Sequence, residues 1–526
     1  MRVITEPLGP GPLACAALAG ETPAGWFDVT APGAWRARVG GIRSSHDAGW
    51  LDAMGPAFGA IGGAAGERLA RAAGGSGVVV TTGQQPGLFG GPIYTWTKAL
   101  SALALADALE RETGAPVAPV FWAATDDADF AEARDTLVAV PGGVERISLE
   151  KAPPDGTPMF AAPLGDVARQ LAALERGAGS AAYLDALRCA RDSYVAGETV
   201  GGAYVRLLRT LLEPLGIAVL DVGHPAFRTA ASPYLREALS HAAALDVAAR
   251  ERAAALSEAG FEQQVAEVKG LSLVFAGMES SKQRVPLDRA SQVAASARPG
   301  DLGATVLLRP ALERRLLPTA AYVAGPGELA YFTQVSAVAD ALGWERPRAV
   351  PRWSATIVEP HVRRILERYG LRMEDFHNPR AIETRLAQAA VPPAATDALR
   401  ELREAADRAA QSLRSARADG GEPVLPRPAV DGFRGQLERR FERLERRLLA
   451  ATKRRETALM RDLGTAEGSL YPMHKRQERA LNFLPILARH GPQLVDEMLA
   501  QARAHAASLV AAPTLPPSQP AEISLL

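Results

Sequence analysis

Two adjacent glutamines stand in a glycine-rich turn in the first fifth of the sequence. The stretch TTGQQPGLFGGPIYTWTKAL, which begins at Thr81, places Gln84 and Gln85 between the apolar run GVVV and a helical pattern. Side-chain amides donate and accept hydrogen bonds, and glycines let ligand atoms approach the backbone closely. The N-terminus of the following helix favours a phosphate or a carboxylate. Because the turn has neither a Walker A nor a GxGxxG motif, it predicts a polar-ligand site, with a tight structural turn as the alternative.

Three aspartates follow the next apolar run, APVAPVFWAA. Asp126, Asp127 and Asp129 all fall in the short segment TDDADF. Carboxylates crowded in this way shift each other's pKa, which suits general acid–base catalysis or the binding of an amine or Mg²⁺. The alternative is a cap for the helical pattern FAEARD, and Asp127 or Asp129 is the candidate for that role.

A third polar group follows a later apolar run, in the segment AYVAGPGELAYFTQV. Glu328 and Tyr331 are three residues apart at the start of a helical pattern, so they share one helix face. An acid in the first turn of a helix is favourable in itself. A capped helix with a core tyrosine is therefore the alternative to a ligand contact.

Two further segments carry polar residues with simpler explanations. His224 follows the run AVLDVG and could enter the same crevice as an acid–base group, although a plain turn histidine explains it as well. The segment ESSKQRVPL is similar to the Lys-Ser loops that hold ATP phosphates in some ligases. We favour a hairpin that exposes Lys282 and Arg284. No histidine has the spacing to cysteine that a zinc site needs, so we predict no zinc.

These polar groups need a parallel sheet to bring them together. Residues 78–80 and 115–124 predict strands on either side of a helix over 93–112, which is a βαβ unit. The runs GATVLLRP and LPTAAYVAG predict further buried strands. Because the carboxyl ends of parallel strands meet at one edge of a sheet, the glutamine, aspartate and glutamate groups are expected to share one crevice.

The same patterns divide the chain into segments with two insertions in an α/β core. We expect core at 1–135, a first connecting insertion at 136–199, core at 200–260, a second connecting insertion at 261–303, core at 304–379, a helical arm at 380–463 and a C-terminal segment that packs back on the core at 464–526. The arm is predicted from heptad spacing. Apolar residues recur every three or four positions in two stretches that a Gly/Pro-rich loop separates, and this favours an antiparallel coiled-coil hairpin that dimerises.

Composition excludes several classes of protein. Lys+Arg and Asp+Glu number 59 each, so the net charge gives no reason to expect nucleic acid or a membrane surface as partner. Cys15 and Cys189 lie far apart outside any CxxC motif, which argues against a disulfide framework. The start of the sequence lacks a basic n-region and no stretch is apolar enough to span a membrane, so we expect a cytoplasmic protein.

Four blocks together resemble the cysteine-adding enzymes of bacillithiol biosynthesis, a family of cysteine ligases. The blocks are TTGQQPGLFGGPIYTWTKALSA, PVFWAATDDADFAEA, LLPTAAYVAGPGELAYFTQV and PRWSATIVEP, and LYPMHKRQERALNFLPILARHGP is similar to the family's closing segment. The resemblance runs in order along nearly the whole chain. It implies a Rossmann-like core similar to class I aminoacyl-tRNA synthetases, two connecting insertions and a coiled-coil arm that forms a homodimer.

The resemblance also implies an activity and two sets of binding residues. The activity is addition of L-cysteine to glucosaminyl-malate, the final step to bacillithiol. Substrate is expected at Gly83, Gln84, Gln85, Gly91 and Tyr94, to which the residue types add His224, Glu328 and Tyr331. An ADP site is associated with the family, and we place ATP or ADP at Tyr471, Gln477, Arg479 and Asn482, with Mg²⁺ as a further candidate.

One departure from the family pattern bears on catalysis. The family commonly has D-H-D-F where this chain has DADF, with Ala128 in place of the histidine. If that histidine were the general base, this chain would lack it, which leaves Asp127 and Asp129 as the better candidates. The departure keeps open a related ligase with a different amine substrate. A non-catalytic nucleotide-binding or coiled-coil scaffold protein is the alternative from another functional class.

Overall fold

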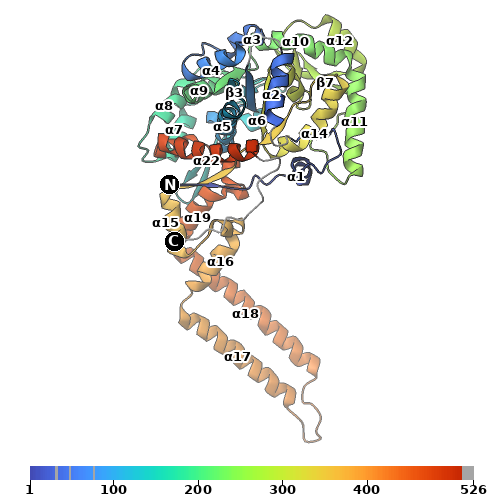
Figure 1. The fold of residues 1–526 in the computed structure, drawn as a ribbon. Helices are drawn as coiled ribbons and strands as arrows, with labels where there is room; N and C mark the ends of the chain where they lie inside the picture. The colour runs from blue at the N-terminus through green and yellow to red at the C-terminus, as the bar shows by residue number, and fades with distance from the viewer. Residues whose placement is uncertain (30–33, 47–48, 75–76, 512–526) are drawn as a thin grey trace. The chain divides into compact units, whose positions relative to one another are not determined.

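The computed structural model describes residues 1–29, 34–46, 49–74 and 77–511, which form two compact units. The first unit comprises Met1–Val138, Glu145–Val358 and the described residues from Arg476 onward. The second unit comprises Ala139–Val144 and Glu359–Lys475 (Figure 1). The seven segment boundaries expected from the sequence stay a prediction.

A five-stranded parallel sheet forms the centre of the first unit, which confirms the predicted sheet. Its strand order is β11–β10–β2–β3–β6. Numbered along the chain, this order is 5-4-1-2-3, so the direction of winding reverses between β2 and β10. Ligands bind at such a reversal, beyond the carboxyl ends of the strands. The bounds are β2 Val78–Gln84, β3 Val117–Ala123, β6 Ala218–Asp221, β10 Thr319–Ala324 and β11 Ala349–Pro351.

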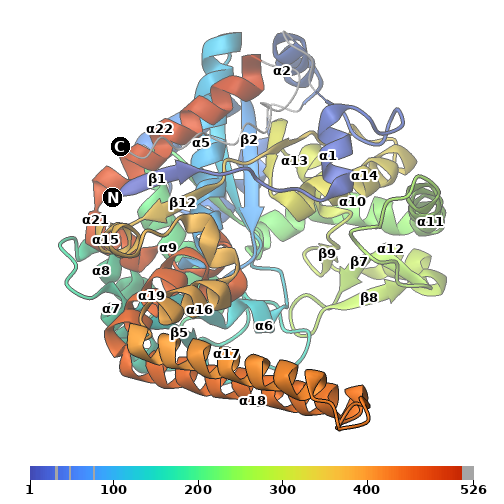
Figure 2. The same ribbon diagram turned by 90° about the horizontal axis from the view of Figure 1, so that it is seen from below.

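The helix after the first core strand is buried on nearly all sides. Helix α5 (Ile93–Thr113) packs against β2, β3 and β10, and α22 (Pro492–Ala511) packs along α5 (Figure 2). The helix has only a small polar face because both the sheet and a second helix cover it. Even Lys98 and Ser101 on α5 are buried.

Two long connections leave the sheet and return to it. From β3 to β6 the chain forms α6 (Phe130–Ala133), the hairpin β4 (Asp135–Val140) and β5 (Gly143–Ser148), α7 (Ala168–Ala178), α8 (Asp185–Ser193) and α9 (Val200–Leu212). From β6 to β10 it forms α10 (Pro225–Ser240), α11 (Ala242–Glu258), a sheet of order β8–β7–β9, α12 (Ala290–Ser296) and α13 (Arg309–Leu316). The bounds of that sheet are β7 Leu271–Ala276, β8 Gln283–Pro286 and β9 Leu302–Ala304.

The run GATVLLRP is not the core strand that its apolar residues predict. Only Leu302–Ala304 is a strand, and it pairs with β7 of the three-stranded sheet rather than with the central sheet. Arg309 begins α13 instead. The apolar residues are buried all the same, because Leu307 and Leu308 join the core, and burial does not distinguish a strand from a turn into a helix.

The ends of the chain and the segments between them complete the first unit. Strand β1 (Arg2–Thr5) pairs antiparallel with β12 (Ala355–Val358). The helices here are α1 (Pro12–Ala19), α2 (Ala34–Ser45), α3 (Trp50–Phe58), α4 (Gly63–Ala73), α14 (Pro326–Ala341), α20 (Gln477–Ala480) and α21 (Leu484–His490). Among the described residues, no helix is long and apolar enough to cross a membrane.

The second unit is helical and contains the predicted arm. Helices α17 (Pro393–Ser415) and α18 (Arg427–Arg455) lie side by side (Figure 2), as the heptad spacing predicts. Arg403 on α17 pairs with Glu438 and Glu445 on α18. The seam is only half covered, because Leu402 and Leu444 expose 51% and 47% of their surface. The other helices are α15 (Pro360–Tyr369), α16 (Pro379–Ala389) and α19 (Thr457–Leu470).

Candidate active site

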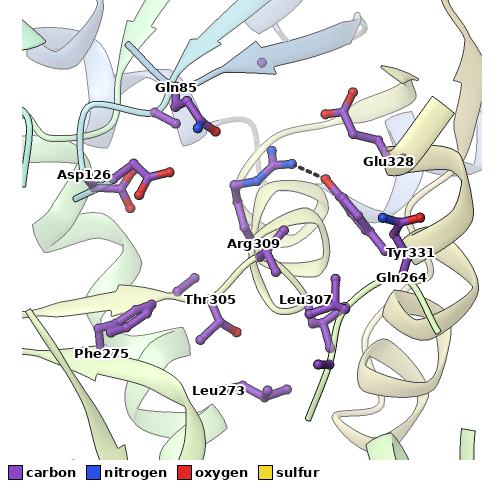
Figure 3. Close-up of a pocket in the computed structure, with 18 of the residues that line it drawn as sticks. Gln85, Asp126, Gln264, Leu273, Phe275, Thr305, Leu307, Arg309, Glu328 and Tyr331 are labelled. Carbon is purple, nitrogen blue, oxygen red and sulfur yellow. Dashed lines mark hydrogen bonds between the residues drawn. The ribbon is translucent and has the colours of Figure 1, made fainter. Parts of the chain in front are cut away.

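A cavity of about 690 Å³ opens beyond the carboxyl ends of β2 and β10, at the reversal of the sheet. It brings together polar groups from all three predicted turns, and their side chains surround it in Figure 3. The residues predicted from the sequence that line it are Gly83, Gln84, Gln85, Tyr94, Asp126, Asp127, Glu328, Tyr331 and Arg479. The apolar residues on its lower side in Figure 3 include Leu273, Phe275 and Leu307.

The glycines of the turn allow close packing of the backbone rather than an open approach for a ligand. A Cβ atom on Gly83 would lie 2.9 Å from the carbonyl oxygen of Trp122 on the neighbouring strand. A Cβ atom on Gly87 would lie 2.7 Å from the Cα of Gly91. A side chain at position 83 would therefore push β2 and β3 apart, and one at position 87 would open the turn. The turn ends at α5 and leaves the side chain of Gln84 at the cavity.

Lys98 on α5 is the cation that organises this turn. Its Nζ donates to the carbonyl oxygen of Gly83 at 2.8 Å and to Oε1 of Gln84 at 3.1 Å. It also lies 2.6 Å from Oε2 of Glu328, which follows β10. One buried ammonium group thus ties the end of β2 to the start of α14 across the point where the winding reverses.

The environment of Glu328 keeps it ionised despite burial. Burial alone would raise the pKa of Glu328, but the charge and hydrogen bond of Lys98 and the hydrogen bond from Tyr322 hold that pKa below its usual value. The hydroxyl of Tyr322 donates to Oε1 at 2.6 Å, and the backbone N–H of Gly325 donates to Oε2 at 2.7 Å. Burial lowers the pKa of Lys98, so its charge depends on Glu328.

A second acid, Glu132, holds the glutamines from the other side. Gln85 Nε2 donates to Oε2 of Glu132 at 2.5 Å, and the hydroxyl of Tyr94 donates to Oε1 at 3.5 Å. Gln84 Nε2 donates to the Tyr94 hydroxyl at 3.0 Å. Burial, together with Asp129 and Asp127, raises the pKa of Glu132. Burial and Glu132 raise the pKa of Tyr94, so the tyrosine stays protonated.

The three aspartates have different positions and partners. Asp129 caps α6, because its Oδ1 accepts from the backbone N–H of Glu132 at 3.0 Å, and it does not line the cavity. Asp127 lines the cavity, but its Oδ1 accepts from the backbone N–H groups of Ala128 and Asp129. Asp126 lines the cavity, and burial raises its pKa. The raised pKa of Asp126 and its place at the cavity suit a proton acceptor.

The predicted hairpin is present, but the expected exposure of its cations was wrong. Strands β7 and β8 pair antiparallel, and Lys282 and Arg284 both line the cavity. The side chain of Lys282 is only 11% exposed. Its Nζ donates to the backbone carbonyl oxygen of Asp126 at 2.8 Å and lies 3.6 Å from Oδ1 of Asp127. The hairpin therefore turns its positive charge towards the aspartates.

Several other predicted residues lie outside the cavity lining. His224 caps α10, because its Nδ1 accepts from the backbone N–H of Ala226 at 3.1 Å. Gly91 is buried in the turn and adopts a positive φ of 73°. Tyr471 belongs to the second unit, where its ring packs edge-on against His377 at 4.8 Å.

The buried amides of the closing segment are occupied by backbone groups. Gln477 accepts from the N–H of Ile357 at 2.7 Å and donates to the carbonyl oxygen of that residue at 2.8 Å. Asn482 donates to the carbonyl oxygens of Phe89 and Gly91. These bonds attach the segment after Arg476 to β12 and to the glycine-rich turn. Of the four residues expected to hold a nucleotide, Arg479 alone lines the cavity.

Sequence reasoning missed three cations and a carboxylate that matter here. Arg352 is 2% exposed and forms a two-point ion pair with Glu478, at 2.7 Å and 2.6 Å. The other missed cations are Lys98 and Arg309, and the carboxylate is Glu132. A lysine in an otherwise apolar helix was the one visible signal for Lys98, because a buried charge needs a partner.

The cavity therefore contains two kinds of polar group, a carboxylate and a set of amides and cations. Asp126 offers a carboxylate with a raised pKa, while glutamine amides and ordered cations surround it. Such an arrangement can bind a molecule that carries both an amine and carboxylates, and can accept a proton from the amine.

Comparison with known proteins places the chain in a family. The model "Bacillithiol biosynthesis BshC, N-terminal Rossmann-like domain" matches residues 61–353. The chain belongs to the BshC family. The family's C-terminal coiled-coil domain matches residues 355–508, so the Rossmann-like fold and the coiled-coil arm agree with the expectation from the sequence.

Relatives in the BshC family match most of the chain. One from Solibacter usitatus is 35% identical over 435 residues, which is 79% of this chain and 81% of the relative. One from Koribacter versatilis is 32% identical over 455 residues, 82% of each chain. One from Salinibacter ruber is 28% identical over 445 residues, 80% of each chain. All three carry the name "Putative cysteine ligase BshC".

Proposed function

We propose that this chain is a ligase that joins L-cysteine to the amine of glucosaminyl-malate, the final step of bacillithiol biosynthesis. The observation that carries the proposal is the cavity at the reversal of the sheet. There the raised pKa of Asp126 coincides with a set of buried, oriented cations. Membership of the BshC family, whose model names bacillithiol biosynthesis, supports the choice of pathway.

In the proposed reaction, the amine nitrogen of the sugar attacks the carboxyl carbon of cysteine and a C–N bond forms. The nitrogen loses a proton, and Asp126 accepts it because its raised pKa makes it a stronger base than an ordinary carboxylate. Gln84 and Gln85 orient the sugar, since their amides line the cavity and are held by Lys98 and Glu132. Negative charge that develops on the carboxyl oxygen is stabilised by the nearby cations.

Amide formation from a free carboxylate also requires that one oxygen leaves. We propose ATP as the co-substrate, because transfer of a phosphoryl or adenylyl group to the carboxylate lets that oxygen leave on phosphorus. Arg479 lies at the cavity and is the candidate contact for the phosphates. Mg²⁺ is a candidate companion of the nucleotide, with Asp127 as a carboxylate within reach of the cavity.

A mass-spectrometric assay tests the proposed function. Purified protein is incubated with glucosaminyl-malate, cysteine and ATP, and we expect bacillithiol together with release of phosphate or AMP. The Asp126→Asn variant should fold but lose roughly 10²- to 10⁴-fold in kcat, the usual contribution of a general base. Asp135→Asn, an acid in surface ion pairs outside the cavity lining, is the matched control and should keep wild-type activity. Absence of product from the wild-type protein would refute the proposal.

We also propose that the arm pairs with a second copy of the chain. Leu402, Leu413 and Leu444 remain largely exposed on α17 and α18, although their spacing is that of a coiled-coil seam. Sedimentation of the Leu402→Glu/Leu444→Glu variant should give a monomer where the wild-type protein gives a dimer. A dimer that persists in the variant would contradict this role of the arm.

A further inference from the structure

Arg309 is a cation at the cavity with only 16% of its side chain exposed. Its Nη1 lies 3.4 Å from Oε2 of Glu313, four residues further along α13. Burial raises the pKa of Glu313 to about 7, against the opposing effects of Arg309 and a hydrogen bond from Thr81. Near neutral pH that carboxyl group is therefore protonated for much of the time, and the ionised carboxylate of Glu328 helps to keep Arg309 charged.

Aromatic side chains fix the plane of the Arg309 guanidinium group. It lies over the ring of Tyr322 at 5.2 Å and over the ring of Trp122 at 6.0 Å. Its Nη2 donates to the hydroxyls of Tyr322 at 3.3 Å and Tyr331 at 3.1 Å. In the described part of the chain, Nε makes no hydrogen bond, so Arg309 keeps donors for a ligand.

Tyr331 adds a second donor beside Arg309. Both tyrosines accept from the arginine, but the hydroxyl proton of Tyr322 is already donated to Glu328 at 2.6 Å. For the hydroxyl proton of Tyr331, the described residues offer no acceptor, although this side chain is only 7% exposed. Burial raises the pKa of Tyr331, which keeps that proton in place. Figure 3 shows the bond between Arg309 and Tyr331 among the residues that line the cavity.

The other unpaired arginines at the cavity are less suited to hold an anion. Arg479 is exposed, so water screens its charge. Arg284 is half-buried, and its Nε already donates a hydrogen bond to the carbonyl oxygen of Ser272 at 2.9 Å. Lys98, Lys282 and Arg352 have ionic partners in Glu328, Asp127 and Glu478. Of these cations, Arg309 is therefore the one that combines a fixed orientation with donors to spare.

We propose that Arg309 and Tyr331 together bind the carboxylate group of a substrate. A guanidinium group beside a hydroxyl presents two donors to two oxygens, and charged hydrogen bonds of this kind are strong in a desolvated site. The source of the carboxylate rests on the proposed function, in which both the malate group and cysteine carry one. This pair of side chains would make the cavity select an acidic substrate over a neutral one.

Calorimetric binding to matched ligand pairs tests the proposal. The first pair is glucosaminyl-malate and methyl glucosaminide, and the second is cysteine and cysteamine. The wild-type protein should prefer the carboxylate-bearing member of at least one pair. Tyr331→Phe and Arg309→Lys should each reduce that preference roughly tenfold or more, with binding of the member that lacks a carboxylate unchanged. The pair that responds identifies which substrate carboxylate is held.

Controls separate the possible failures. Arg315→Gln removes one positive charge from the same helix, at an exposed position outside the cavity lining, and should keep the wild-type preference. Tyr331→Phe removes a single oxygen atom, so it decides the question if Arg309→Lys fails to fold. A preference that survives in Tyr331→Phe, or a wild-type protein that binds both members of each pair equally, would overturn the carboxylate site alone. A wild-type protein that binds none of the four ligands would instead refute the proposed function and the site with it.

Discussion

The ion pair at the cavity is buried, whereas the ion pair on the arm is exposed to water. At the cavity, Lys98 is 5% exposed and lies 2.6 Å from Glu328, which is 16% exposed. On the arm, Arg403 is 37% exposed and pairs at 3.1 Å with Glu438, which is 50% exposed. The distances are similar, yet water screens the second pair and hardly reaches the first.

The difference shows what each pair contributes. A buried pair adds little net stability, because desolvation offsets the attraction, but loss of one partner leaves an uncompensated charge. Such a pair holds its neighbours in one arrangement, here the turn at Gln84 and the start of α14. An exposed pair can exchange its partner for water at little cost. We therefore expect buried ion pairs, rather than exposed ones, to fix the side chains that take part in the reaction.

The largest effect is expected from Lys98→Met. This change removes the ammonium group at similar volume and leaves Glu328 buried without its cation. We expect the free energy of unfolding to fall by about 3–5 kcal/mol, as for other broken buried pairs. Urea denaturation measures the loss.

A double variant checks the cause of that loss. Lys98→Met combined with Glu328→Gln removes both charges and should recover part of the stability. If the single variant unfolds no more readily than the wild-type protein, the buried pair does not hold the cavity together.

A smaller effect on the free energy of unfolding, one that depends on pH, is expected from Glu313. Its pKa of about 7 in the folded protein compares with the ordinary 4.5. Between these values the folded state binds more protons than the unfolded state, so stability is lost as pH rises and is level above pH 7 or so. A difference of about 2.5 pH units, at about 1.4 kcal/mol per unit, amounts to roughly 3–4 kcal/mol.

Thermal or urea unfolding across pH 4–8 measures this dependence in Glu313→Gln. The variant keeps the shape of the protonated side chain and has no proton to lose, so its stability should decline less than that of the wild-type protein over this range. Glu438→Gln, on the exposed arm, is the control and should decline as the wild-type protein does. If stability falls equally with pH in the wild-type protein and in Glu313→Gln, the buried carboxyl group does not hold its proton.

The smallest effect is expected from Arg403→Gln on the arm. This variant loses both exposed ion pairs, with Glu438 and Glu445. Measured pairs of this exposure contribute about 0.2–1 kcal/mol. Unfolding of the variant should therefore change little and should approach the wild-type value in high salt. A loss as large as that of Lys98→Met would remove the distinction between the two regions.

The sequence alone predicts the local parts of the site well. An apolar run, a polar turn and a helical pattern occur at Gln84, at Asp126 and at Glu328, and the structure brings all three residues to one cavity. Each pattern is confined to a few neighbouring residues. The parallel sheet that joins them follows from the βαβ order of the elements.

The parts that the sequence could not predict depend on distant segments. Lys98 is buried against the end of β2 and the start of α14, and its partner Glu328 lies far along the chain. Arg309 was hidden in an apolar run that predicted a strand. Gln477 and Asn482 were predicted to bind a nucleotide, but their amides bond to backbone groups. The residue type alone does not distinguish an amide with a structural role from one that binds a ligand.

The central claim is that the cavity at the reversal of the sheet holds the substrates. A crystal structure of the protein with glucosaminyl-malate tests it most directly. We predict density for the sugar beside Gln84 and Asp126, with a carboxylate within hydrogen-bond distance of Arg309 and Tyr331. Density for the ligand at another site, with this cavity empty at saturating concentration, would contradict the account.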